Sequence, residues 1–294
     1  MDLPLVVGSD GSESSLRAVD WAADEAALRG TPLRVVYASL WERYEGSALA
    51  RDLGKPDAQV LAEDIVRAGA HRARSRQADL PISMAALPED PAYALVREGK
   101  NASALVVGSR GRSGVVNVLL GSVSLFVAAH ADCPVIVVRG SHDNQARMPV
   151  HGRVVVGVGD DSAAAVRFAA QEAERRGALL DAVRAWRCPA HETIDHPLLA
   201  GAPERVYEEQ AAEALEAALR DLPPEAKVQR RTVEGTARRV LLGAAYDADL
   251  LVVGAQRRSG HFGLQLGRVA HTVLHHSPCP VAVVPERARE HSRA

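Results

Sequence analysis

Short apolar runs alternate with longer amphipathic segments along the chain. Residues 3–7 form a short aliphatic run, which predicts a strand. Residues 12–15 offer side chains that can cap a helix, and Gly30 can end that helix. Between them, apolar residues recur at helical spacing at Leu16, Val19, Ala23 and Ala26. The pattern predicts one strand followed by one helix.

The same alternation continues as far as residue 138. Further strands are expected at residues 33–37, 82–87, 105–107 and 135–138. Further helices are expected at residues 58–73, 92–99 and 122–131. Strands that are apolar throughout and separated by helices predict an α/β fold, with a parallel sheet covered on both faces. Ligands of such sheets bind at the carboxyl ends of the strands, near the topological switch point.

The second half of the chain repeats the first. Leu105-Val106-Val107-Gly108 recurs as Leu251-Val252-Val253-Gly254, and Cys133-Pro134-Val135 recurs as Cys279-Pro280-Val281, both displaced by 146 residues. A chain of 294 residues is long enough for two domains of this size. We therefore expect two tandem domains with a linker and a tail, at residues 1–140, 141–152, 153–285 and 286–294.

Charge and composition narrow the classes of partner. The 35 basic and 37 acidic residues leave a net charge of −2, which argues against a nucleic-acid-binding protein. The longest apolar stretch, residues 115–129, is broken by glycine and polar residues and is shorter than the roughly 20 residues of a membrane span. Three widely spaced cysteines, with no charged-then-apolar leader, lead us to expect a cytoplasmic protein.

Two loops of the first copy carry candidate binding chemistry. After the strand that ends at Val107 comes Gly108-Ser109-Arg110-Gly111, and nine residues later Gly121-Ser122-Val123-Ser124 opens a helix. Glycines let the backbone approach a ligand, and free amides at a helix start suit phosphate oxygens. The Ser122 and Ser124 hydroxyls could add donors. Arg110 is either a phosphate clamp or a solvated loop residue.

The loop after the first strand, Gly8-Ser9-Asp10-Gly11-Ser12, permits two interpretations. Asp10 could accept hydrogen bonds from ribose hydroxyls or an adenine amino group. Alternatively, Asp10 and Ser12 only cap the following helix or shape a turn. The glycine pattern is neither a Walker loop, because no lysine follows its last glycine, nor a dinucleotide fingerprint.

Some residues recur in both copies and are better explained by structure than by catalysis. His130 recurs as His276, and Cys133 recurs as Cys279. Matching positions in two copies favour a role in the fold over metal binding or nucleophilic chemistry.

At these residues the chain resembles the universal stress proteins, and the resemblance extends over both copies. The glycine pattern of that family is present as Gly108, Gly111, Gly121 and Ser122. Residues 6–12 are similar to its first strand and turn, and Cys133-Pro134-Val135 to its closing strand. The resemblance implies two domains similar to the adenine nucleotide alpha hydrolases, each with five parallel strands in the order 3-2-1-4-5.

The resemblance also implies a ligand and partners. ATP, or AMP or ADP, is expected over the glycine loop, with Mg²⁺ beside a triphosphate and no metal ligand named. Internal pairing of the two copies through their last strands, and further homodimerisation, are expected as well. The expected contacts of the nucleotide are Gly8, Ser9, Asp10, Ala38, Val107, Gly108, Arg110, Gly111, Gly121, Ser122, Val123 and Ser124.

Efficient catalysis is not expected, because phosphoryl transfer needs metal ligands and a positioned nucleophile, and no such set is visible. We expect a nucleotide-dependent stress-response regulator or sensor that acts on an unidentified regulatory protein. A slow ATPase and a nucleotide-independent scaffold are the alternatives.

The second copy departs from the pattern at the expected site. Gly111, Ser122 and Ser124 are replaced by Arg257, Arg268 and Ala270. The first-strand loop is two residues shorter, although Asp160 or Asp161 could substitute for Asp10. We expect this site to be impaired or empty. The competing idea is that Arg257 and Arg268 bind phosphate themselves.

Overall fold

The computed structural model describes residues 3–40, 58–109, 120–139, 151–188, 202–256 and 266–286. These residues form two compact units, called here the first lobe and the second lobe, and the chain passes from one to the other at Pro149. Each lobe is described separately. None of the helices in the described ranges is long and apolar enough to cross a membrane.

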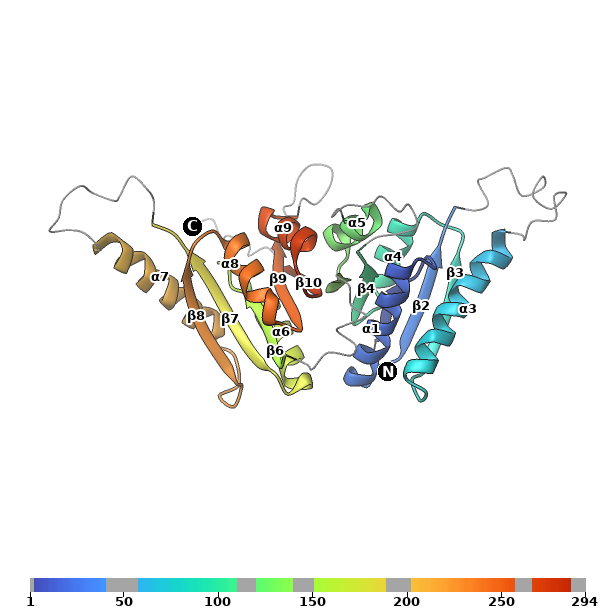
Figure 1. The fold of residues 1–294 in the computed structure, drawn as a ribbon, viewed down its shortest axis with the longest axis horizontal. Helices are drawn as coiled ribbons and strands as arrows, with labels where there is room; N and C mark the ends of the chain where they lie inside the picture. The colour runs from blue at the N-terminus through green and yellow to red at the C-terminus, as the bar shows by residue number, and fades with distance from the viewer. Residues whose placement is uncertain are drawn as a thin grey trace, which may run out of the picture. The chain divides into compact units, whose positions relative to one another are not determined.

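The first lobe is built on a parallel sheet (Figure 1). Its strands are β1 (Leu5–Gly8), β2 (Leu33–Ala38), β3 (Ile82–Leu87), β4 (Ala104–Gly108) and β5 (Val135–Val138). Hydrogen-bonded neighbours give the order β3-β2-β1-β4-β5, and every pairing is parallel. The predicted order 3-2-1-4-5 is therefore confirmed for this lobe.

Helices cover both faces of the first sheet. They are α1 (Glu13–Arg29), α3 (Ala58–Arg76), α4 (Pro91–Gly99) and α5 (Ser122–His130). Helices α1 and α3 pack together on one face, and α4 and α5 pack together on the other. The predicted helices are confirmed, with ends that differ by one to three residues.

The second lobe repeats this architecture. Its strands are β6 (Arg153–Gly157), β7 (Leu179–Trp186), β8 (Val228–Glu234), β9 (Leu250–Gln256) and β10 (Val281–Glu286), in the order β8-β7-β6-β9-β10. Its helices are α6 (Ala163–Arg176), α7 (Ala202–Leu219), α8 (Ala237–Ala244), the short 3-10 helix η2 (Ala245–Asp247) and α9 (Arg268–His276). Strand β10 ends at Glu286, one residue beyond the expected end of the second domain at residue 285.

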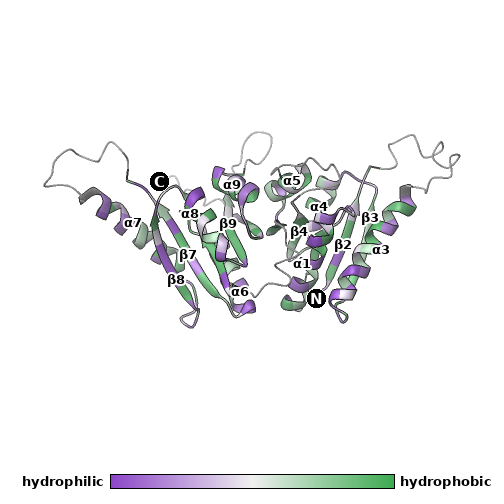
Figure 2. Cartoon of the chain, viewed as in Figure 1, coloured by the Kyte–Doolittle hydropathy of each residue, from purple (hydrophilic) through white to green (hydrophobic). Residues whose placement is uncertain are grey.

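Burial explains why the apolar runs become strands. All five residues of β4 are buried, and the first three residues of β1 are fully buried. Helices cover both faces of these central strands, so their sequences are apolar throughout rather than alternating. Figure 2 shows the contrast, with strands mostly hydrophobic and helices striped.

Capping residues set the ends of α1. Ser12 is the N-cap, and its hydroxyl oxygen accepts a hydrogen bond from the Ser15 amide at 3.3 Å. Gly30 ends the helix with φ +66°, a left-handed conformation that glycine adopts at little cost. The capping interpretation of Ser12 is confirmed.

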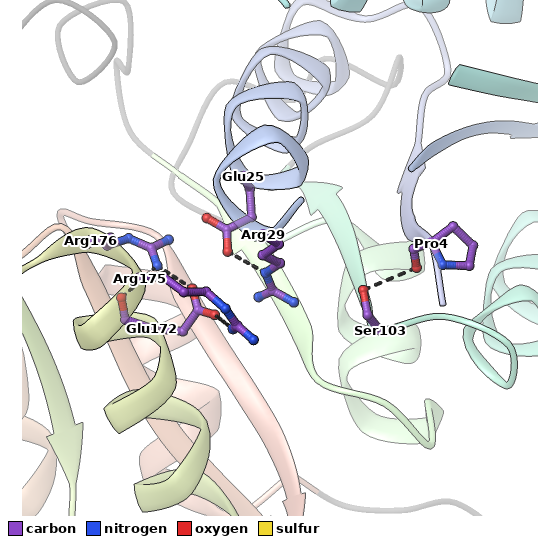
Figure 3. Close-up of polar contacts among 7 residues, drawn as sticks. All are labelled: Pro4, Glu25, Arg29, Ser103, Glu172, Arg175 and Arg176. Atoms are coloured by element: carbon purple, nitrogen blue, oxygen red, sulfur yellow. Dashed lines mark hydrogen bonds and ion pairs between the residues drawn. The ribbon is translucent and has the colours of Figure 1, made fainter. Parts of the chain in front are cut away.

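A buried ion pair occurs at the same helical position in each lobe (Figure 3). In α1, Arg29 Nε lies 2.6 Å from Glu25 Oε1, and both side chains are almost fully buried. In α6, displaced by 147 residues, Glu172 binds Arg176 and also Arg175, and its carboxylate has no exposed surface. The sequence analysis did not single out this repeated pair.

Candidate functional site

The loop after β1 is held in one shape by a chain of short contacts. The Ser9 amide donates to the Val36 carbonyl at 2.9 Å, which extends the ladder one residue beyond β1. Asp10 Oδ1 accepts from the Ser12 amide at 3.0 Å, and the Asp10 amide donates to Ser15 Oγ at 3.2 Å. Asp10 thus shapes the turn between β1 and α1. Asp10 remains half-buried at the carboxyl end of the sheet.

The strand end at Gly108 allows no side chain. A Cβ atom there would lie 2.7 Å from the Ser14 carbonyl oxygen and 2.8 Å from Ser14 Oγ. Because the first of these atoms is backbone, the clash could be relieved only by moving the start of α1. The glycine therefore brings the end of β4 into direct contact with the first turn of α1.

Two hydrogen bonds close the base of the glycine loop. The Gly121 amide donates to the Ser109 carbonyl at 2.8 Å, and Ser124 Oγ donates to the Gly108 carbonyl at 2.6 Å. The single hydroxyl proton of Ser124 joins α5 to β4, so in this arrangement it is not available to a phosphate. Arg110 and Gly111, both expected contacts, lie outside the described residues.

The start of α5 provides the feature best suited to an anion. Gly121 is the N-cap, and no side chain caps the helix. The first amides of a helix have no intrahelical partner and carry partial positive charge. Ser122 is exposed beside them, and Val123 is half-buried. This end of α5 is suited to an anion, because its backbone amides are preorganised and no side chain of the described residues caps them.

The topology brings these parts to one edge. Strands β1 and β4 are neighbours, and the chain runs to β2 on one side and to β5 on the other. Their carboxyl ends therefore meet at the switch point, where ligands of such sheets bind. Two buried residues lie at the same edge of the sheet, Val107 near the end of β4 and Ala38 at the end of β2.

Sequence reasoning missed the contact roles of several residues that shape this edge. Ser14 packs on Gly108, Ser15 receives the Asp10 amide, and Leu95 of α4 lies against Gly8, where a Cβ would be 2.9 Å from Leu95 Cδ1. Ser14 and Ser15 were treated only as helix-capping candidates. The density of serines after Asp10 was a signal for this network, whereas no sequence signal places Leu95.

The repeated histidine and cysteine have structural environments. His130 stacks on Phe126 with ring centroids 3.9 Å apart. Cys133 and Cys279 are buried, and burial raises the pKa of the Cys279 thiol to about 11, although the Ser277 hydroxyl opposes the shift. A thiol with so high a pKa is protonated at neutral pH and is a poor nucleophile.

The corresponding edge of the second lobe has a different set of contacts. Asp160 pairs with Arg184, and Asp161 accepts from Gln256. Arg268 is exposed at the first position of α9, whose N-cap is Gly267. Arg257 lies outside the described residues.

Comparison with known proteins decides the family. The sequence profile of the Universal stress protein family matches residues 3–139 and again residues 151–285. The chain belongs to the universal stress protein family. A universal stress protein of Mycobacterium tuberculosis is 34% identical over 299 residues, which cover 95% of this chain and 96% of that protein.

Solved universal stress proteins share this architecture. The structure of one from Archaeoglobus fulgidus is similar over 96% of this chain and 98% of its own, with 19% identity and a TM-score of 0.68. Another, solved in complex with cAMP, is 32% identical over 47% of this chain and 98% of its own, with a TM-score of 0.37. The first of these two extends over both lobes and has the same fold.

Proposed function

We propose that this chain is a nucleotide-dependent stress-response regulator or sensor that binds an adenine nucleotide, ATP in the first instance, in its first lobe. The observation that carries the proposal is the start of α5, which has a glycine N-cap and no side-chain cap. This helix start belongs to the same sheet edge as the ordered loop at Asp10.

Each part of the edge has a distinct role in this proposal. The α5 amides and the Ser122 hydroxyl bind phosphate oxygens. Asp10 accepts hydrogen bonds from the nucleoside, and Gly8 and Gly108 let Leu95 and Ser14 pack against the strand ends that carry the site. Ser9, Ala38, Val107, Val123 and Ser124 build the walls, while Arg110 and Gly111 complete the phosphate loop. Mg²⁺ would accompany a triphosphate.

The site favours binding over turnover. Efficient phosphoryl transfer needs metal ligands, a positioned nucleophile and charge stabilisers. Among the expected contacts that the structure describes, Asp10 is the residue that carries a carboxylate. One oxygen of that carboxylate already accepts a hydrogen bond from the Ser12 amide. A sensor instead requires that nucleotide bind one state of a surface more tightly than another. The slow ATPase and the nucleotide-independent scaffold remain the competing functions.

Calorimetric titration of ATP with Mg²⁺ into nucleotide-stripped protein tests the proposal. Gly121→Asp places a carboxylate on the α5 amides, which caps the helix and repels phosphate, so we expect binding to be lost without unfolding. Asp10→Ala should also abolish or strongly weaken binding. The matched control is Gly267→Asp at the N-cap of α9, where a Cβ meets nothing within 4 Å.

Each outcome selects one function. Binding that is lost in both first-lobe variants, is kept in Gly267→Asp and is not followed by sustained phosphate release supports the sensor. Phosphate release sustained above the Gly121→Asp background supports the ATPase. If the wild-type protein binds no nucleotide, the sensor and the ATPase are both wrong, and the scaffold remains.

A further inference from the structure

A side-chain contact joins two strand ends at the switch point of the second lobe. Gln256 Nε2, at the end of β9, donates to Asp161 Oδ2, in the loop after β6, at 2.6 Å. Strands β6 and β9 are neighbours that correspond to β1 and β4 of the first lobe. The contact therefore crosses the place where a nucleoside would enter between the two loops.

The second candidate for the role of Asp10 is also engaged. Asp160 Oδ1 lies 2.7 Å from Arg184 Nη2, near the end of β7. Although Asp160 is 87% exposed, the Arg184 side chain is 18% exposed. The two acidic residues after β6 thus bind the strand ends on either side of them.

Helix α6 begins late, and a carboxylate from another strand caps it. When the repeats are aligned on Ala18 and Ala165, α6 begins three residues after the position at which α1 begins. Glu286 accepts from the Ala164 amide at 3.0 Å and from the Ala165 amide at 2.8 Å. Its side chain is 5% exposed, so a buried anion occupies the start of this helix.

The capping carboxylate also takes the place of the missing helical turn. In the first lobe, Ser14 of α1 lies against Gly108. In the second lobe, Glu286 Oε1 lies 3.0 Å from where a Cβ of Gly254 would be, and Gly254 corresponds to Gly108. The space beside the last strand glycine is thus occupied by Ser14 of α1 in the first lobe and by the Glu286 carboxylate in the second lobe.

The strands of the second lobe also pair further than those of the first. The pairing of β4 with β5 is described as far as Gly108 and Val138. The pairing of β9 with β10 continues past Gly254 through Ala255 and Gln256, which face Pro285 and Glu286. This extension carries Gln256 and Glu286 to the edge, where each makes its contact.

We propose that Asp161, Gln256 and Glu286 seal the second lobe against nucleotide, so that the chain takes up one nucleotide, in the first lobe. The hydrogen bond between Asp161 and Gln256 ties the loop after β6 to the end of β9, and the Glu286 carboxylate, held by two amides of α6, disfavours a phosphate nearby. The proposal rests on the proposed function for its ligand, but the seal itself is a property of the free protein.

Hydrogen exchange with and without ATP and Mg²⁺ locates the bound nucleotide. We expect ATP to slow exchange at residues 121–125 and to leave residues 158–166 and 252–256 unchanged, with one equivalent bound per chain. Protection of the second set by ATP, or one equivalent retained by Gly121→Asp, would overturn the proposal. The second result would favour phosphate binding by the arginines of the second lobe.

A second arm tests the seal without nucleotide. Glu286→Ala removes the acceptor of the Ala164 and Ala165 amides, and we expect their exchange to accelerate about tenfold or more. The control is Glu234→Ala, at the exposed end of β8. Unchanged exchange at both amides in a folded Glu286→Ala protein would show that no seal exists there. If ATP protects neither lobe, the proposed function is wrong, and this arm still decides the seal.

Discussion

At the scale of single residues, Gly108 shows why substitution of a glycine in this family pattern is destabilising. We predict that Gly108→Ala lowers the free energy of unfolding by about 1–3 kcal/mol, because the methyl group would meet the Ser14 carbonyl at 2.7 Å. Nucleotide affinity should fall with it, because the start of α1 and the Asp10 loop must move. Urea denaturation and calorimetry measure the two effects.

The second lobe supplies the control for this prediction. At Gly254 the same methyl group would lie 3.0 Å from Glu286 Oε1, a contact that a shift of a few tenths of an ångström relieves, whereas at Gly108 it would lie 2.7 Å from a backbone oxygen. Gly254→Ala should therefore cost less stability than Gly108→Ala. Equal losses in the two variants would contradict the steric explanation.

The Cys279 thiol gives a prediction about reactivity. Because burial raises its pKa to about 11, we expect Cys279 to resist iodoacetamide at pH 8 in folded protein that carries Cys133→Ala and Cys188→Ala. The same protein in urea should react quickly. Mass spectrometry of the alkylated chain measures both rates, and rapid labelling of the folded form would show that the thiol is accessible.

The same pKa has a consequence for stability at high pH. In the unfolded chain the thiol loses its proton near pH 9, whereas in the folded chain it keeps the proton until about pH 11. The contribution of the protonated Cys279 thiol to the free energy of unfolding is therefore complete below pH 9. It is lost as the pH rises towards 11, at about 1.4 kcal/mol per pH unit. Relative to wild type, Cys279→Ala should show a shallower loss of stability over this window.

At the scale of elements, strand β7 contains a buried carboxylate that its apolar neighbours do not explain. Asp181 has no exposed surface, and Arg231 of β8 lies 3.0 Å from its Oδ2. Its counterpart in the first lobe is Arg34, which pairs with Glu98 of α4 at 2.7 Å. The same place in the sheet thus carries opposite charges in the two lobes, each with its own partner.

We predict that Asp181→Ala destabilises the second lobe by about 1–2 kcal/mol, because it leaves Arg231 and the nearby Arg153 without their carboxylate, while both arginines are about one-third exposed to water. Chemical denaturation followed at Trp186 of β7 measures the loss. In a double-mutant cycle, Arg231→Ala should cost less in the Asp181→Ala background than in wild type. Additive losses would show that the pair is not coupled.

Most elements of this fold could be predicted because hydropathy determines them. The runs at Ile82–Leu87 and Val135–Val138 become β3 and β5 with the predicted bounds. Strand β5 is buried throughout, whereas β3 is an edge strand with Ser83 and Met84 exposed. The end of β10 could not be predicted in the same way, because Glu286 reads as the start of a polar tail. Glu286 belongs to the strand because its carboxylate binds amides of α6, a long-range contact that no local pattern reveals.

The candidate site was predictable to a similar degree. Glycine spacing and Asp10 indicated the sheet edge at which β1 and β4 end, because strand ends and turn residues are local features. The contact between Ser124 and Gly108 was not predictable, since it depends on how far α5 approaches β4. The seal of the second lobe depends likewise on residues that are distant in sequence.

At the scale of the whole molecule, duplication produced two lobes with one architecture and different edges. We predict that ATP at 100 times its Kd stabilises the first lobe by about 2.7 kcal/mol. Trp186→Phe leaves Trp21 of α1 and Trp41 as first-lobe fluorescence reporters of thermal unfolding. The shift in the midpoint should disappear with Gly121→Asp and persist with Gly267→Asp.

The cap on α6 also bears on where the second domain ends. The family profile matches as far as residue 285, and hydropathy places the end of the last strand earlier still. A polypeptide that ends at residue 285 would keep the apolar residues of β10. It would lose the Glu286 carboxylate, which binds the Ala164 and Ala165 amides. A fragment of the second domain that keeps this helix cap must therefore extend to residue 286, one residue beyond the family match.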